Sequence, residues 1–215
     1  MATHPRTGSS LIQATRRGFA ALSLAACGAA AACGTSASTF ANVPPGTGTL
    51  ASKSPSGTRS FQVRDVLVFR NVFGTQISTE DLYITLTDAT NACGLFEREQ
   101  DLAGASSLQL YVTKQDGTYP PIPAGTYGYS TLTDDGPPIL FAITRQTLDG
   151  TCQPISPEHG EQGSITLTRI DEQGAAGTFD VFVGGEELTG TFDGSYCPRP
   201  SSFATRTCVS ASPAQ

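Results

Sequence analysis

Residues 177–193 read GTFDVFVGGEELTGTFD, a stretch in which Gly-Thr-Phe-Asp occurs twice. Gly184 and Gly185 lie midway between the two copies, and such a pair can adopt the positive φ angles of a two-residue hairpin turn. The cross-strand pairs expected from this turn are Phe179–Gly190, Phe192–Gly177, Val181–Leu188 and Thr178–Thr191. Each aromatic ring then covers a glycine that would leave the sheet bare, and a slip of one residue would undo the match. The stretch predicts an antiparallel β-hairpin with one register.

Four other stretches alternate apolar and polar residues, which is typical of half-buried strands. Their apolar sets are Leu82–Ile84–Leu86, Leu108–Leu110–Val112, Ile139–Phe141–Ile143 and Ile165–Leu167. Residues 61–72 are more continuously apolar, which predicts a strand covered on both faces, with a bulge where the alternation slips near Arg64 and Asp65. We expect eight or nine strands in an all-β fold, arranged as a single antiparallel β-sandwich. A small eight- to nine-stranded β-barrel is the alternative.

The N-terminal residues resemble the signal of a bacterial lipoprotein. Arg16 and Arg17 precede a short apolar run that ends at Leu24-Ala25-Ala26-Cys27, a sequence that resembles a lipobox. The resemblance implies cleavage after residue 26 and a lipid such as palmitate on Cys27. A weaker version of the pattern makes Cys33 the alternative anchor. The run is shorter than the about 20 apolar residues of a membrane span, so we expect lipid anchoring in the bacterial envelope, with the outer membrane or cell surface favoured.

The residues around Arg16 and Arg17 also resemble the twin-arginine export motif, which implies export of a folded chain. Ala20 and Ala21 stand where that motif has Leu and Lys, and an ordinary basic signal needs only positive charge. Disulfide formation outside the reducing cytosol counts against export in the folded state. Both export routes therefore stay open.

The chain divides by composition into four segments. Between Gly34 and Arg59, 20 of 26 residues are Gly, Pro, Ser, Thr or Ala, too few apolar groups to offset the entropy of ordering the chain. The predicted segments are a signal peptide at 1–26, a lipid-anchored flexible linker at 27–59, a β-domain at 60–208 and a frayed tail at 209–215.

The charge balance excludes several partners. The signal holds Arg6, Arg16 and Arg17 and no acid, so the rest of the chain has 10 basic against 19 acidic residues and a net charge near −9. Phosphates require Lys and Arg, which argues against binding to nucleic acid. The chain also lacks a glycine-rich phosphate loop, so no nucleotide is expected. Contact with the membrane is expected through the covalent lipid alone.

Four cysteines remain in the β-domain, and four cysteines allow three pairings. Cys197 and Cys208 are close in sequence, so we expect a Cys197–Cys208 disulfide together with Cys93–Cys152. The spacings match no zinc-ligand pattern and histidine is scarce, so no metal and no cofactor are predicted.

Few residues suggest catalysis. His159 is the one histidine of the β-domain, it lies among acids in a loop, and no Gly-x-Ser-x-Gly motif occurs. Acid pairs occur at Asp134-Asp135, Asp171-Glu172 and Glu186-Glu187. Adjacent acids are common at turns, and Asp134-Asp135 lacks the rest of a calcium loop. Glycosidases use two carboxylates that the fold brings together, which keeps an envelope glycan hydrolase as an alternative function.

Tyrosines offer the one candidate ligand surface. Tyr119, Tyr127 and Tyr129 lie close together in the chain near a proline-rich corner. Aromatic rings can contact sugars or partner proteins, although strand tyrosines more often pack with the ring buried and the hydroxyl in water.

Residues 160–197 resemble the Gly-Thr-Phe-Asp hairpin of small β-rich envelope lipoproteins, a resemblance that implies no activity. The sequence predicts a lipid-anchored β-domain that acts as a non-enzymatic binding or scaffolding module for an envelope protein or ligand. The alternatives are the glycan hydrolase and a small inhibitor or immunity-type protein.

Overall fold

A computed structural model describes residues 43–53, 60–72, 80–114, 121–131, 136–197 and 206–210, all within the compact unit of residues 37–215. These residues confirm the all-β antiparallel fold. The elements are β1 Thr47–Ser52, β2 Asp65–Val72, β3 Glu80–Thr87, α1 Ala92–Glu97, β4 Gln100–Leu102, β5 Ser106–Lys114, β6 Gly125–Gly128, β7 Ile139–Leu148, β8 Pro154–Ile170, β9 Gly174–Val183, β10 Glu186–Ser195 and β11 Thr207–Val209.

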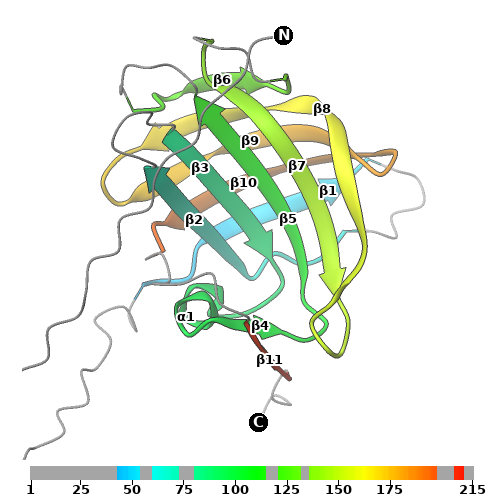
Figure 1. Ribbon diagram of the computed structural model, residues 1–215. Helices are drawn as coiled ribbons and strands as arrows, with labels where there is room; N and C mark the ends of the chain where they lie inside the picture. The colour runs from blue at the N-terminus through cyan, green and yellow to red at the C-terminus, as the bar shows by residue number, and fades with distance from the viewer. Residues whose placement is uncertain are drawn as a thin grey trace, which may run out of the picture. The chain divides into compact units, whose positions relative to one another are not determined.

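One continuous sheet contains nine of these strands. Its order is β1-β10-β9-β8-β7-β5-β3-β2, with the short β6 paired to β8. Neighbours along the main path are antiparallel, so the chain runs up and down through the sheet. Figure 1 shows this sheet wrapped round, with β2, β3, β5 and β7 in front and β8, β9 and β10 behind. A sheet that curls back on itself fits the barrel alternative, because closure removes exposed strand edges.

At the seam of the barrel, β2 lies against β1 and β10, and the contact consists mainly of side-chain packing with few hydrogen bonds. Val68 forms an isolated parallel bridge with Tyr196, and its carbonyl accepts a bond of 2.9 Å from the N–H of Cys197. A Cβ added at Gly194 would lie 2.8 Å from the Cγ2 of Val68, and one at Gly48 would lie 3.0 Å from the Cγ2 of Val66. The glycines of β1 and β10 therefore leave room for the valines of β2 at the seam.

Apolar side chains fill the interior of the nearly closed barrel. Leu82, Ile84 and Leu86 of β3 alternate inward as predicted, each fully buried. Other fully buried members of this core are Leu108, Leu110, Leu140, Ile165, Val181 and Leu188.

The register of the β9–β10 hairpin is confirmed. Phe179 pairs with Gly190, and Phe192 pairs with Gly177. The remaining predicted pairs, Val181–Leu188 and Thr178–Thr191, are also present. Gly184 and Gly185 have φ angles of 60° and 78°, the left-handed conformation that the turn requires.

The pattern of β7 differs from the prediction that Phe141 and Ile143 share one face. The register between β5 and β7 shifts at Tyr111 and Val112. Leu140 and Ile143 are therefore the core residues, while Phe141 is half-buried and packs edge-on against Tyr111. A β-bulge inserts one residue and reverses the faces of those that follow, which strict alternation cannot reveal. The slip near Arg64 and Asp65 instead marks the start of β2 at Asp65.

A small cap lies against the outer face of the barrel. It consists of α1, β4 and β11, and β11 pairs parallel with β4. Leu67 of β2 is 4 % exposed in a second apolar cluster that includes residues of α1, and the rings of Phe69 and Phe96 are 4.2 Å apart. In Figure 1 the cap lies below the front strands.

Two disulfides fasten the cap, and the predicted pairing is wrong. Cys93 of α1 bonds Cys197, and Cys152 bonds Cys208 of β11, with Cα–Cα distances of 5.6 and 5.5 Å. Cys197 follows β10 and lies where the seam brings it to α1. Cys208 lies in β11, which pairs with β4, and the chain just after β4 is hydrogen-bonded to the turn between β7 and β8 through the N–H of Gly104 and the carbonyl of Asp149. Closeness in sequence favours a Cys197–Cys208 bond, but the fold brings Cys197 to Cys93 of α1 and Cys208 to Cys152 in the turn between β7 and β8.

The predicted linker and tail also need correction. Residues 47–52 fall within the predicted linker at 27–59, yet they form β1, whose six residues all pair with β10. The apolar Leu50 packs against the core, which a linker residue would not do. Val209, the first residue of the predicted tail, pairs with Leu102. The β-domain thus begins before residue 60.

The predicted export signal and the predicted lipid anchor fall outside the described residues: these are Arg16, Arg17, Cys27 and the alternative Cys33. In the described part of the chain, no helix has the length and hydropathy needed to cross a membrane.

Candidate functional site

Charged side chains enter the barrel at one end. Arg145 of β7 lies opposite Leu108, a fully buried core residue of β5, and its own side chain is only 11 % exposed. Its Nη1 donates to Oε2 of Glu186 at 3.1 Å, and its Nη2 donates to Oε2 of Glu158. Glu186 begins β10 two residues before the buried Leu188, and its side chain is 6 % exposed. The hydroxyl of Ser52 donates to its other oxygen.

We call Ser52, Arg145, Glu158 and Glu186 the charged mouth. Moving charges out of water is costly, and well-packed apolar residues of similar volume often stabilise a protein as well as a buried ion pair. The core cluster of the described residues is otherwise built from Leu, Ile, Val and Phe, together with Ala175 and Tyr127. A charged group at this one end of an apolar barrel is therefore a candidate for a role other than stability.

A hollow of about 430 Å³ opens beside the charged mouth. Its lining combines the Arg145–Glu158 pair with hydroxyl groups and two apolar residues. The lining residues are Ser60, Phe61, Ser106, Arg145, Gln146, Thr147, Ile155, Ser156 and Glu158. Ser156 has a φ of 46°, and Ile155 is 53 % exposed, a large value for an apolar side chain. Mouths of β-barrels are frequent ligand sites, and strained residues gather at such sites.

The hollow can bind a small polar molecule. Arg145 and the hydroxyls of Ser106 and Thr147 can donate hydrogen bonds, while Glu158 and the same hydroxyls can accept them. Phe61 and Ile155 supply apolar contact. Both carboxylates of the mouth contact the same guanidinium, so they are held in fixed positions near each other.

The predicted tyrosine surface is not assembled as expected. Tyr127 is 7 % exposed and belongs to the core, with its hydroxyl donating to the carbonyl of Pro123, so its assignment to a ligand surface is wrong. Burial raises the pKa of the Tyr127 hydroxyl. Tyr129 is 37 % exposed at the end of β6, and Tyr119 lies outside the described residues. The alternation at 125–128 puts Tyr127 inward, opposite Ile165.

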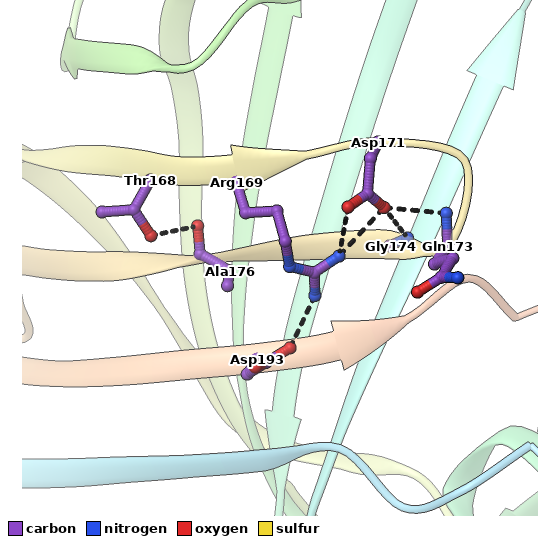
Figure 2. Close-up of polar contacts among 7 residues, drawn as sticks. All are labelled: Thr168, Arg169, Asp171, Gln173, Gly174, Ala176 and Asp193. Atoms are coloured by element: carbon purple, nitrogen blue, oxygen red, sulfur yellow. Dashed lines mark hydrogen bonds and ion pairs between the residues drawn. The ribbon is translucent and has the colours of Figure 1, made fainter.

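The acid pairs separate into different roles. Glu186 points into the barrel, while its neighbour Glu187 binds Lys53 on the outside. Asp171 organises the turn between β8 and β9, as Figure 2 shows: it accepts bonds from Arg169 and from the backbone N–H groups of Gln173 and Gly174. The bond from Arg169 and the N–H of Gln173 lower the pKa of the Asp171 carboxyl.

These turn contacts are structural. Arg169 also donates to Asp193 of β10 at 2.7 Å, so its guanidinium links the turn to the neighbouring strand. The Asp134-Asp135 pair lies outside the described residues. In the described chain no group of His, Cys, Asp and Glu has the arrangement of a metal site. Nδ1 of His159 is 3.4 Å from the hydroxyl of Thr144.

Arg145 is not among the site residues predicted from the sequence, although its position in the strand pattern indicates an inward side chain. It lies two residues after Ile143, in the phase of the core side chains of β7. Glu186 is likewise in phase with Leu188. A charged residue in the apolar phase of a strand indicates a buried ion or the end of the core, and only the assembled barrel brings the two residues together.

Comparison with known proteins adds no relative: no protein-family model, no curated protein and no solved structure matches this chain.

Proposed function

We propose that this protein is an exported, lipid-anchored and non-enzymatic binding module that takes a small polar ligand at the charged mouth. The observation that carries the proposal is the Arg145–Glu158–Glu186 cluster inside the end of an apolar barrel, beside a hollow of about 430 Å³. Such a hollow suits a ligand that both donates and accepts hydrogen bonds.

Export and anchoring have support of their own. Two disulfides join distant parts of the β-domain, and disulfides persist in oxidising compartments such as the bacterial envelope. The lipid would be carried by Cys27, or by Cys33 as the alternative. Because β1 begins at Thr47 and reaches the charged mouth only at Ser52, the chain enters the barrel at the end away from the mouth.

A binding experiment tests the proposed function. The full chain is titrated by NMR with neutral monosaccharides, α-amino acids and diamines at millimolar concentration. Binding should shift signals of the hollow-lining residues. The combined substitution Arg145→Met, Glu158→Gln and Glu186→Gln removes the charges together and should abolish these shifts while the fold persists. Shifts that remain in this variant, or no response to any class of probe, would refute the assignment of the mouth.

Anchoring is tested separately by metabolic labelling with a tagged palmitate. The Cys27→Ala variant should lose the label and the Cys33→Ala variant should retain it. The reverse result would move the anchor to Cys33, and an unlabelled wild-type chain would remove the anchor altogether.

A glycan hydrolase remains the second candidate, because two carboxylates bind one guanidinium beside the hollow. The measurement is release of reducing ends from envelope glycans by the full chain. Release that disappears with Glu158→Gln would establish the enzyme in place of the binding module.

A further inference from the structure

The outer face of the front strands carries a second candidate site, which shares Gln146 with the lining of the hollow beside the charged mouth. Thr85 of β3 pairs with Gln109 of β5, and Ser107 of β5 pairs with Gln146 of β7. We call these four residues the polar strip. Neighbouring strands are about 4.8 Å apart, so the strip offers hydrogen-bonding groups at short, regular intervals across three strands.

Two apolar walls border the polar strip. The cap supplies Leu95, Phe96 and Leu102, which line a hollow of about 130 Å³ together with all four residues of the strip. On the other side, Tyr83 and Tyr111 lie two residues before Thr85 and two after Gln109 in their strands. Their rings stack with centroids 4.3 Å apart, and Phe141 packs edge-on against Tyr111. The polar strip thus lies between the cap and these rings on the outer face, and we call the strip with its two borders the trough (the strands in Figure 1 are β3, β5 and β7).

The walls are held rigidly. Both disulfides fasten the cap, and the guanidinium of Arg206 lies 4.1 Å from the centre of the Phe96 ring while Nη1 donates to Asp101 at 2.6 Å. The hydroxyl of Tyr111 donates to the buried Asp81 at 2.8 Å. Burial, with this hydrogen bond, raises the pKa of the Tyr111 hydroxyl, which therefore stays neutral. A preformed trough loses little entropy when a ligand enters.

The polar strip has unused hydrogen-bonding capacity and no charge. In the described part of the chain, the side chains of Thr85, Ser107, Gln109 and Gln146 make no hydrogen bond to other protein groups. Arg206 and Asp101 at the edge neutralise each other. On a chain with a formal net charge of −6, a neutral trough favours an uncharged occupant, because a polyanion would be repelled and a polycation would find stronger sites elsewhere.

We propose that the trough binds a neutral glycan. A pyranose unit presents hydroxyl groups that the amides and hydroxyls of the polar strip can bind, and apolar C–H groups that fit the walls. The length of one pyranose unit is comparable with the spacing between strands. A glycan that crosses the strands therefore places successive sugar units over successive strands. The rings of Tyr83 and Tyr111 stack on each other, so their facing sides are not available to a sugar. The affinity for the glycan therefore depends mainly on its hydrogen bonds to the polar strip.

The test is isothermal titration of the full chain with three probes: a hexasaccharide of glucose, a hexasaccharide of N-acetylglucosamine and hexagalacturonate. At least one neutral hexasaccharide should bind, and the charged one should not. The combined variant Thr85→Val and Gln109→Leu, two residues that line this hollow but not the one at the mouth, should weaken that binding about tenfold or more, since two hydrogen-bonding groups are lost. Gln162→Leu, an exposed substitution on β8 outside the trough, is the matched control and should bind as the wild type does.

Circular dichroism of both variants confirms that the fold persists. Failure of both neutral probes at millimolar concentration would overturn the proposal, as would preference for hexagalacturonate. Unchanged binding by the double variant would equally overturn it. The mouth variant described above should still bind the glycan, so failure at one site is distinguishable from failure at the other.

Discussion

Phe179 lies over Gly190 so closely that the glycine cannot be exchanged without movement. A Cβ at Gly190 would lie 2.6 Å from Cζ of the Phe179 ring and 2.0 Å from the carbonyl oxygen of Thr49 in β1. Phe179 is 4 % exposed in the core. The absence of a side chain at Gly190 therefore allows both the close packing of the Phe179 ring and the close approach of β1.

Gly190→Ala should destabilise the protein by about 1–3 kcal/mol, the usual cost of overpacking a core. The free energy of unfolding from urea denaturation measures the effect. Gly128→Ala is the matched control, because no atom lies within 4 Å of the added methyl group. Equal stability of the two variants would mean that the Phe179 ring does not pack on Gly190.

The success of the hairpin prediction and the failure of the disulfide prediction have one explanation. The register of β9 and β10 depends on residues within one short stretch, where Gly184–Gly185 and the repeated Phe leave one good alignment. Cys93 and Cys197 are 104 residues apart and meet only because the barrel closes. The sequence of β1 has the composition of a linker, and its strand conformation depends on β10 as a partner.

Peptide mapping without reduction should recover Cys93–Cys197 and Cys152–Cys208. Replacing Cys152 and Cys208 by Ala should cost about 2–4 kcal/mol, largely because the unfolded chain regains freedom. Since this bond fastens β11 to the turn between β7 and β8, hydrogen exchange should accelerate at β4 and β11 and remain slow in the β9–β10 hairpin. A Cys93–Cys152 peptide in place of these two would contradict the structure.

Asp171 should make stability depend on acid pH. Its pKa is lowered in the folded state by the Arg169 bond and the turn N–H groups, so the folded protein binds fewer protons than the unfolded chain near the ordinary aspartate pKa of about 3.9. Its contribution is present above that pH and is lost as pH falls through the lower folded pKa.

The Asp171→Asn variant should therefore be less stable than the wild type at neutral pH, with a difference that shrinks at strongly acid pH. Urea denaturation across this range measures it. Glu172→Gln changes the neighbouring carboxyl outside the network of Figure 2 and should leave the acid dependence unaltered. A difference that is constant with pH would exclude an ionised Asp171 as the cause.

The candidate sites were harder to predict than the strands, for a reason that Arg145 illustrates. Alternation identifies which residues share a face, but a bulge such as the one near Phe141 changes the phase. The charged mouth combines residues of β1, β7, β8 and β10, and the polar strip depends on the register of β3, β5 and β7. Neither set has a local spacing that a sequence motif could express.

Arg145→Met should destabilise the protein by about 3–5 kcal/mol, because Glu186 and Glu158 would lose the guanidinium that compensates their partly buried charges. Adding Glu158→Gln and Glu186→Gln to this variant should restore most of the stability, since no charge then remains without its partner. Urea denaturation at neutral pH compares the three proteins.

Arg169→Met provides the control, because Arg169 also binds two carboxylates but is 36 % exposed; such surface pairs contribute about 0–1 kcal/mol. If Arg145→Met cost no more than Arg169→Met, water would reach the cluster freely. Recovery in the combined variant, with loss of ligand response, would mean that these charges are dispensable for folding and serve binding. Such a result would show that the charged mouth is maintained for ligand binding and not for the stability of the fold.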